Sequence, residues 1–141
     1  MRRTLSKASS GALFAGMLAL GLTNAAIAQT VSTTFSVQNS FGAAISLDTV
    51  NCSPSASISP PFSIANNKTG TFSASATGGT LLCTVRYQNG SNGCQFQIQV
   101  NVVGGTTTGF VSANAYKGSG GRPHCSGSPG LNQQTGSFTM Q

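Results

Sequence analysis

The fold is decided by residues 81–103, which read LLCTVRY (81–87), QNGSNG (88–93) and CQFQIQVNVV (94–103). Polar and apolar residues alternate strictly in the last part, which is the pattern of a half-buried β-strand. The first part carries a matching apolar row, and the two Asn-Gly pairs between the parts tolerate the positive φ that tight hairpin turns require. We therefore predict a central hairpin with the inward residues Cys83, Val85, Tyr87, Cys94, Phe96, Ile98, Val100 and Val102.

Similar alternation continues on both sides of this hairpin, and no segment of residues 29–141 shows the apolar period of a helix. The stretch Gly118–Gly130 is rich in Gly, Ser and Pro, so it is expected to be a loop held only by Cys125. About eight short strands separated by turns predict an all-β fold, an antiparallel β-sandwich. Besides the hairpin, the expected strands are Val31–Val37, Ala43–Val50, an inward row at Phe62 and Ile64, Thr71–Ala76, Phe110–Tyr116 and Thr135–Met140.

The first 28 residues have the three parts of a secretory signal peptide. Residues 2–7 carry positive charge, and the apolar run Gly11–Leu22 is too short to span a bilayer as a helix. Ala26-Ile27-Ala28 then fits the small-x-small rule for cleavage. We predict export to the periplasm or the extracellular space, a bacterial source because the signal is rich in alanine, and a single mature domain of residues 29–141.

The mature chain of 141 − 28 = 113 residues carries few charges. Its basic residues are Lys68, Arg86, Lys117 and Arg122, and with Asp48 as the single acid the formal net charge is 4 − 1 = +3. These cations are scattered along the sequence, whereas a nucleic-acid site needs lysines and arginines clustered on one face. Nucleic acid is therefore not an expected partner.

Four cysteines in an exported chain of this size predict two disulfides. The equal separation of 31 positions favours Cys52–Cys83 and Cys94–Cys125. The competing pairing joins Cys83 to Cys94 and Cys52 to Cys125, and it requires the two hairpin cysteines to lie opposite each other. A turn centred on either Asn-Gly pair places them out of register. A zinc site that combines cysteines with His124 is disfavoured, because no Cys-x-x-Cys spacing is present and the compartment is oxidising.

The mature chain contains one carboxylate side chain, Asp48, and one histidine, His124. Glycoside hydrolysis by paired carboxylates is thereby strongly disfavoured. A Ser-His-Asp triad would have to use both residues, and no Gly-x-Ser-x-Gly elbow supports it. We therefore expect a protein that is not an enzyme and holds no metal or cofactor.

Two groups of residues are candidates for ligand contact. Lys117, Arg122 and His124 share the expected loop and would suit anionic head groups or acidic glycans. The outward row of the hairpin offers amides that both donate and accept hydrogen bonds, which would suit sugar hydroxyls or a like surface. The alternative interpretations, a solvated loop and the solvent face of a sandwich, stay open at this point. The outward row consists of Gln95, Gln97, Gln99 and Asn101.

Five short motifs between Val31 and Val103 resemble the layout of aegerolysin-type β-sandwiches. They are Val-Gln-Asn (37–39), Ile-Ser-Leu (45–47), Pro61–Ile64, Thr-Gly-Thr-Phe (69–72) and Val-Arg-Tyr (85–87). The resemblance implies a small sandwich that binds membrane lipids, as the members of that family do, some of them as partners in pore formation. No functional residue is transferred from it.

These observations predict an exported, non-enzymatic binding or surface-interaction protein that contacts lipid head groups or glycans. The alternative is a structural subunit of a pilus-like surface assembly. Such a subunit would self-associate through an open sheet edge, expected at the terminal strands Val31–Val37 or Thr135–Met140.

Overall fold

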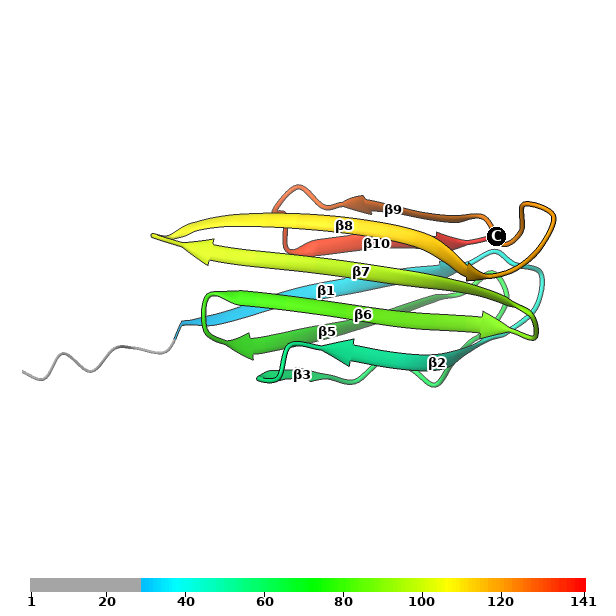
Figure 1. Ribbon diagram of the computed structural model, residues 1–141, viewed down its shortest axis with the longest axis horizontal. Helices are drawn as coiled ribbons and strands as arrows, with labels where there is room; N and C mark the ends of the chain where they lie inside the picture. Colours follow the sequence, from blue (N-terminus) through cyan, green and yellow to red (C-terminus); the bar gives the residue numbers. More distant parts are fainter. Residues whose placement is uncertain (1–28) are drawn as a thin grey trace, which may run out of the picture.

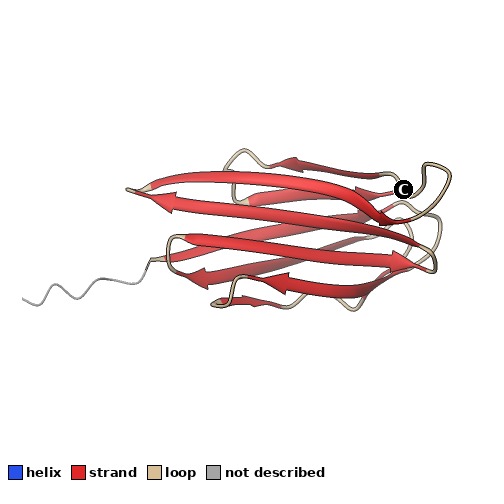
Figure 2. Ribbon diagram, in the orientation of Figure 1, coloured by secondary structure: helices blue, strands red, loops and turns tan. Residues whose placement is uncertain are grey.

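The computed structural model describes residues 29–141, so the predicted signal peptide, 1–28, lies outside the described residues. Within 29–141 the chain forms strands and turns, and no helix is present (Figure 2). The ten strands are β1 (Thr30–Asn39), β2 (Ile45–Cys52), β3 (Ala56–Ile58), β4 (Ser63–Ile64), β5 (Thr69–Thr77), β6 (Thr80–Asn89), β7 (Asn92–Val103), β8 (Thr106–Lys117), β9 (Cys125–Pro129) and β10 (Thr135–Met140).

The strands form two packed sheets of five strands each. Sheet A has the order β3-β5-β1-β10-β9, and sheet B has the order β4-β2-β6-β7-β8. Figure 1 shows the sandwich with sheet B in front of sheet A. Neighbouring strands are antiparallel except for β1 and β10, which run parallel side by side. The predicted sandwich is confirmed, and its additional strands are the short edge strand β3 and the strand β9.

The central hairpin, β6 and β7, is confirmed. Asn89 pairs with Asn92 around a two-residue loop, and Gly90 at the first loop position has a φ of 56°. That conformation is open to glycine without steric cost, which explains the residue. The predicted inward residues are fully buried except Val102, which is partly buried near the end of its strand.

The core lies between the two sheets and is centred on aromatic rings. Phe35 on β1 stacks on Phe72 at 5.0 Å and on Phe138 at 5.6 Å between ring centroids. Phe138 in turn meets Phe96 of the opposite sheet at 5.0 Å. Offset aromatic contacts of this kind stabilise beyond the burial of their area. They hold the two sheets together beneath the outer face of sheet B.

Both favoured disulfides are present, Cys52–Cys83 and Cys94–Cys125. The first joins residues directly opposite each other on β2 and β6, and the second links β7 of sheet B to β9 of sheet A. The competing pairing fails because Cys94 lies opposite Tyr87, four positions from Cys83. Two disulfides indicate an oxidising environment outside the cytoplasm.

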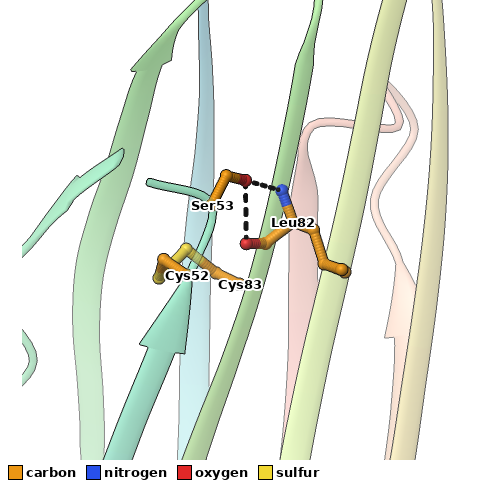
Figure 3. Close-up of a disulfide and its surroundings, with 4 residues drawn as sticks. All are labelled: Cys52, Ser53, Leu82 and Cys83. Carbon is orange, nitrogen blue, oxygen red and sulfur yellow. Dashed lines mark hydrogen bonds between the residues drawn. A yellow bond between two sulfur atoms is a disulfide. The ribbon is translucent and has the colours of Figure 1, made fainter. Parts of the chain in front are cut away.

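Beside the first disulfide, Ser53 attaches the end of β2 to β6 (Figure 3). The Ser53 hydroxyl accepts a 2.8 Å hydrogen bond from the amide of Leu82 and lies 3.2 Å from the Leu82 carbonyl, to which it donates. The backbone amide of Ser53 donates to the same carbonyl at 2.8 Å. This clasp fixes the position of the loop that follows β2.

Two local predictions are wrong. The stretch Gly118–Gly130 is not all loop, because β9 pairs with β10 from Cys125 to Pro129. Its sequence, CSGSP, shows no alternation since it is an edge strand that is mostly exposed. Phe62 does not point inward and is 77% exposed, whereas Ile64 is buried. Strand β4 begins only at Ser63, so no pleat orients the ring of the preceding residue.

The terminal strands are not open edges, so that expectation is wrong as well. β1 and β10 pair with each other in the middle of sheet A, and β5 and β9 flank them. Their backbone groups are therefore already used by neighbouring strands. The sheet edges are β3 and β9 in sheet A and β4 and β8 in sheet B, and β8 is by far the longest of these.

Candidate functional site

The three residues predicted from the loop, Lys117, Arg122 and His124, do not converge on one site. Arg122 lines a hollow of about 520 Å³ together with Lys117, and a second hollow of about 410 Å³ together with His124. The first hollow is formed by one continuous segment, Ala115–Pro123, and is thus the inside of the loop itself. The backbone of His124 exchanges hydrogen bonds with Gln141, which holds it beside the C-terminus.

Lys117 instead turns toward the outer face of sheet B. Its ammonium donates to the side-chain oxygen of Gln88 at 2.5 Å and lies 3.9 Å from the carboxylate of Asp48. Gln88 belongs to β6, the central strand of sheet B, and Asp48 belongs to the neighbouring strand β2. Asp48 therefore partly neutralises the charge of Lys117, which was expected to be presented by the loop.

The amide row of β7 lies on the same outer face, as predicted, and each of its side chains is half-buried by its neighbours. The strand register places Gln99 between Leu82 of β6 and Phe110 of β8. These two apolar side chains are 39% and 58% exposed. The outer face of sheet B thus combines amides and hydroxyls with a small number of exposed apolar side chains.

A groove follows β2 and β6 on this face. One hollow of about 340 Å³ is lined by Asn51, Cys52, Ser53, Pro54, Leu82 and Thr84. A second, of about 460 Å³, is lined by Thr49, Val50, Asn51, Thr84, Arg86 and Gln95. The two hollows adjoin, because Asn51 and Thr84 line both of them and face each other across the strand pair. We call them together the β2–β6 groove.

The β2–β6 groove changes in character along its length. Its first end is apolar, with Pro54 and Leu82. Its middle offers the amide of Asn51 and the hydroxyl of Thr84. Its other end carries the guanidinium of Arg86. This arrangement can hold a ligand with an apolar surface, several hydroxyls and an acceptor group at one end.

Arg86 is fixed in place by two contacts. Its Nε donates a 2.9 Å hydrogen bond to the side-chain oxygen of Gln95, its partner on β7. Its guanidinium carbon lies 4.8 Å from the ring centroid of Tyr116, a cation–π contact. Within residues 29–141 its terminal nitrogens have no hydrogen-bond or ion-pair partner. They are available to a ligand in the groove.

Two β-bulges bring Tyr116 over the sheet. The pairing shifts by one residue between Leu47 and Thr49, where Asp48 lies, and opposite Gly93 and Cys94, where Tyr116 lies. The phenol of Tyr116 donates to the carboxylate of Asp48 at 2.7 Å. A bulge redirects a side chain relative to the pleat, which allows this contact across the two strands between them.

Gly93 makes room for the tyrosine. A Cβ atom at this position would lie 2.5 Å from Cε1 and 2.6 Å from Cζ of Tyr116, which is closer than non-bonded carbons approach. The ring therefore rests on the bare backbone of β7. Burial, the hydrogen bond to Asp48 and the negative charge of that carboxylate raise the pKa of the Tyr116 phenol well above its usual value, although Arg86 opposes the shift. The phenol therefore keeps its proton, and donates to Asp48, to higher pH than a free tyrosine would.

Only part of this site could be predicted from the sequence. The outward position of Arg86 follows from the alternation of β6, and its contact with Gln95 follows from the hairpin register. The groove itself was missed because it needs β2 beside β6, and the contact with Tyr116 was missed because it depends on two bulges. The single signal was an arginine on a strand whose other outward residues are uncharged.

No protein-family model and no curated protein matches this chain. The resemblance to aegerolysin-type sandwiches accordingly stays a prediction. In the part of the chain that the structure describes, no three His, Cys, Asp or Glu side chains are grouped closely enough to hold a metal ion. Residues 29–141 also contain no helix long and apolar enough to cross a bilayer.

Proposed function

We propose that this chain is an exported, non-enzymatic binding protein whose ligand is a glycan held in the β2–β6 groove. The observation that carries the proposal is the order of side chains along the groove, from Leu82 through Thr84 and Asn51 to Arg86. The two disulfides support the exported location, because such bonds persist in oxidising compartments.

A glycan suits this surface for chemical reasons. A sugar ring has apolar C–H faces, which pack on side chains such as Leu82 and Pro54, and a rim of hydroxyls that both donate and accept hydrogen bonds. The amide of Asn51 and the hydroxyl of Thr84 supply both functions. The groove is built on paired strands, and the Ser53 clasp fixes the loop at one end of it, so its groups are held in place before a ligand arrives.

The other expected ligand, a lipid head group, has less support. Membrane contact requires exposed apolar side chains next to the cations. Head-group contact was predicted at the loop that carries Arg122 and His124, and no exposed large apolar residue belongs to that loop. Those residues of the described chain are Val50, Phe62, Leu82, Val103, Phe110 and Leu131, of which Val50 and Leu82 line the β2–β6 groove instead. A pilus-like subunit also loses its expected contact, since the terminal strands are internal.

The test is glycan binding by groove variants of the exported protein, measured first on a glycan array and then by titration calorimetry with the strongest array ligand. Thr84→Val and Asn51→Ala each remove one hydrogen-bonding group and should weaken binding about three- to tenfold. Thr108→Val is the matched control, because Thr108 is an exposed threonine of the same face outside the groove. If Thr84→Val and Thr108→Val bind the glycan equally well, the β2–β6 groove is not the binding site. If the protein binds no glycan at all, the proposed function is wrong.

A further inference from the structure

We infer that the glycan carries a carboxylate, as in a uronic-acid unit, and that Arg86 binds it at one end of the β2–β6 groove. The inference rests on the proposed function and names the class of ligand for the same site. Arg86 is the one cation that lines the groove.

The guanidinium is oriented for a planar anion. Its Nε is occupied by Gln95, and its central carbon lies over the ring of Tyr116, 4.8 Å from the ring centroid. The remaining donors lie in a single plane at the edge of the group. A carboxylate accepts two parallel hydrogen bonds from such an edge, and these charge-assisted bonds are stronger than bonds between neutral groups.

The charges around the site leave Arg86 without a partner of its own. Asp48 is the single acidic side chain of residues 29–141, and it accepts from Tyr116 and pairs with Lys117. It forms no ion pair with Arg86 within 4.0 Å. The one carboxylate side chain of residues 29–141 is thus taken by Tyr116 and Lys117, and Arg86 has no ion-pair partner among these residues. A negative ligand complements it.

The dimensions of the groove point to a sugar acid in preference to a small free anion. Arg86, Thr84 and Leu82 follow one another on the outward side of β6, and alternate residues of a strand lie about 7 Å apart. A free carboxylate or phosphate would engage Arg86 alone. A uronic-acid unit would place its carboxylate on Arg86 and its ring hydroxyls beside Thr84 and Asn51, and the next unit would reach Leu82 and Pro54.

The experiment compares charged and uncharged forms of the same sugars. The probes are oligosaccharides of galacturonate, glucuronate and mannuronate, each paired with its methyl ester, which keeps the ring and removes the charge. The exported protein should bind at least one acid about tenfold or more tightly than its ester, and Arg86→Gln should abolish this preference. Arg86→Lys should recover only part of it, because an ammonium lacks the planar fork.

Two further variants separate a specific site from general attraction. Lys68→Gln removes the same charge from the turn between β4 and β5, outside the groove, and should keep the preference for the acid. Arg122→Gln tests whether the loop is the anion site instead. Equal losses for Arg86→Gln and Lys68→Gln, or a loss confined to Arg122→Gln, would overturn the inference.

The outcomes also distinguish this inference from the proposed function. Binding of esters and acids with equal affinity, weakened by Thr84→Val but not by Arg86→Gln, would overturn the carboxylate and leave the glycan groove standing. Binding of a sulfated glycan in preference to every uronic acid would likewise overturn it. If neither acids nor neutral glycans bind, both proposals fail. Thermal unfolding of Arg86→Gln, compared with that of Arg86→Lys, verifies that the variant proteins are folded.

Discussion

Tyr116 on β8 donates a 2.7 Å hydrogen bond to Asp48 on β2, across β6 and β7, the two strands that lie between them in sheet B. Both residues lie at β-bulges, and the ring passes over Gly93 on its way. The same ring lies 4.8 Å from the guanidinium carbon of Arg86. One contact between distant strands therefore ties together the sheet and orients the cation of the proposed glycan groove.

The bond between Tyr116 and Asp48 should be measurable as a coupling energy. Tyr116→Phe keeps the ring against Arg86 and removes the donor, and Asp48→Asn removes the charge of the acceptor. In urea unfolding, Tyr116→Phe should lower the free energy of unfolding by about 1 kcal/mol, and the double variant should lose less than the sum of the single variants. Strict additivity would show that the two side chains do not interact in solution.

The tyrosines should make stability depend on alkaline pH. Burial raises the pKa of Tyr87, and burial together with Asp48 raises that of Tyr116. In the unfolded chain both phenols lose protons near pH 10. Because the folded values are higher, the stabilisation is fully present below about pH 10 and is lost as the pH rises toward the folded values.

The free energy of unfolding should thus fall above about pH 10, and absorbance near 295 nm should show the folded phenols titrating later than those of the urea-unfolded chain. Tyr116→Phe serves as the control, because it should reduce the slope and leave the contribution of Tyr87. Titration of both folded phenols at the unfolded value would contradict the prediction.

The two disulfides should contribute equal loop entropy but different local order. Each closes a separation of 31 residues, so replacing either pair by alanine should cost about 3–4 kcal/mol in the chain-entropy model. Loss of Cys94–Cys125 should also release β9, an edge strand paired only with β10. Loss of Cys52–Cys83 leaves β2 joined to β6 by the Ser53 clasp and the strand pairing.

Hydrogen exchange distinguishes the two variants. Amides of Cys125–Pro129 should exchange faster in the Cys94→Ala/Cys125→Ala variant and remain unchanged in the Cys52→Ala/Cys83→Ala variant. Equal exchange of β9 in both would mean that the disulfide does not hold this strand.

Asn39, at the end of β1, is the asparagine whose replacement should lower the stability of the protein the most. It is fully buried, and its side chain donates to the carbonyls of Ala43 and Ile64 at 2.8 Å each and accepts from the amide of Phe41 at 3.0 Å. Asn39→Ala leaves these three backbone groups without that partner, so we expect a loss of about 3 kcal/mol in denaturant unfolding.

Asn66→Ala is the matched control for this prediction. The side chain of Asn66 accepts a single exposed hydrogen bond from the amide of Gly42, so its removal should cost less than about 1 kcal/mol. Similar losses for Asn39→Ala and Asn66→Ala would show that burial of the amide does not set the cost.

The amino-acid pattern alone was enough to assign the buried face of the two hairpin strands, β6 and β7. Alternation with a period of two is a local property, so Val85 and Phe96 could be assigned to the core and Arg86 and Gln95 to the outer face. The disulfide pairs could also be predicted locally. The equal separation of 31 residues favoured them, and the turn between β6 and β7 places Cys83 and Cys94 out of register, which disfavours the competing pairing.

Which strands are neighbours depends on long-range pairing, and the local pattern does not contain it. The alternation of β1 and β10 is the same whether they form edges or lie in the middle of a sheet, and β9 shows no alternation because it is mostly exposed. The two bulges each shift the strand register by one residue, and a periodic sequence pattern does not predict where such a shift occurs. The groove, and the ring of Tyr116 against Arg86, exist because long-range pairing brings together residues far apart in the chain.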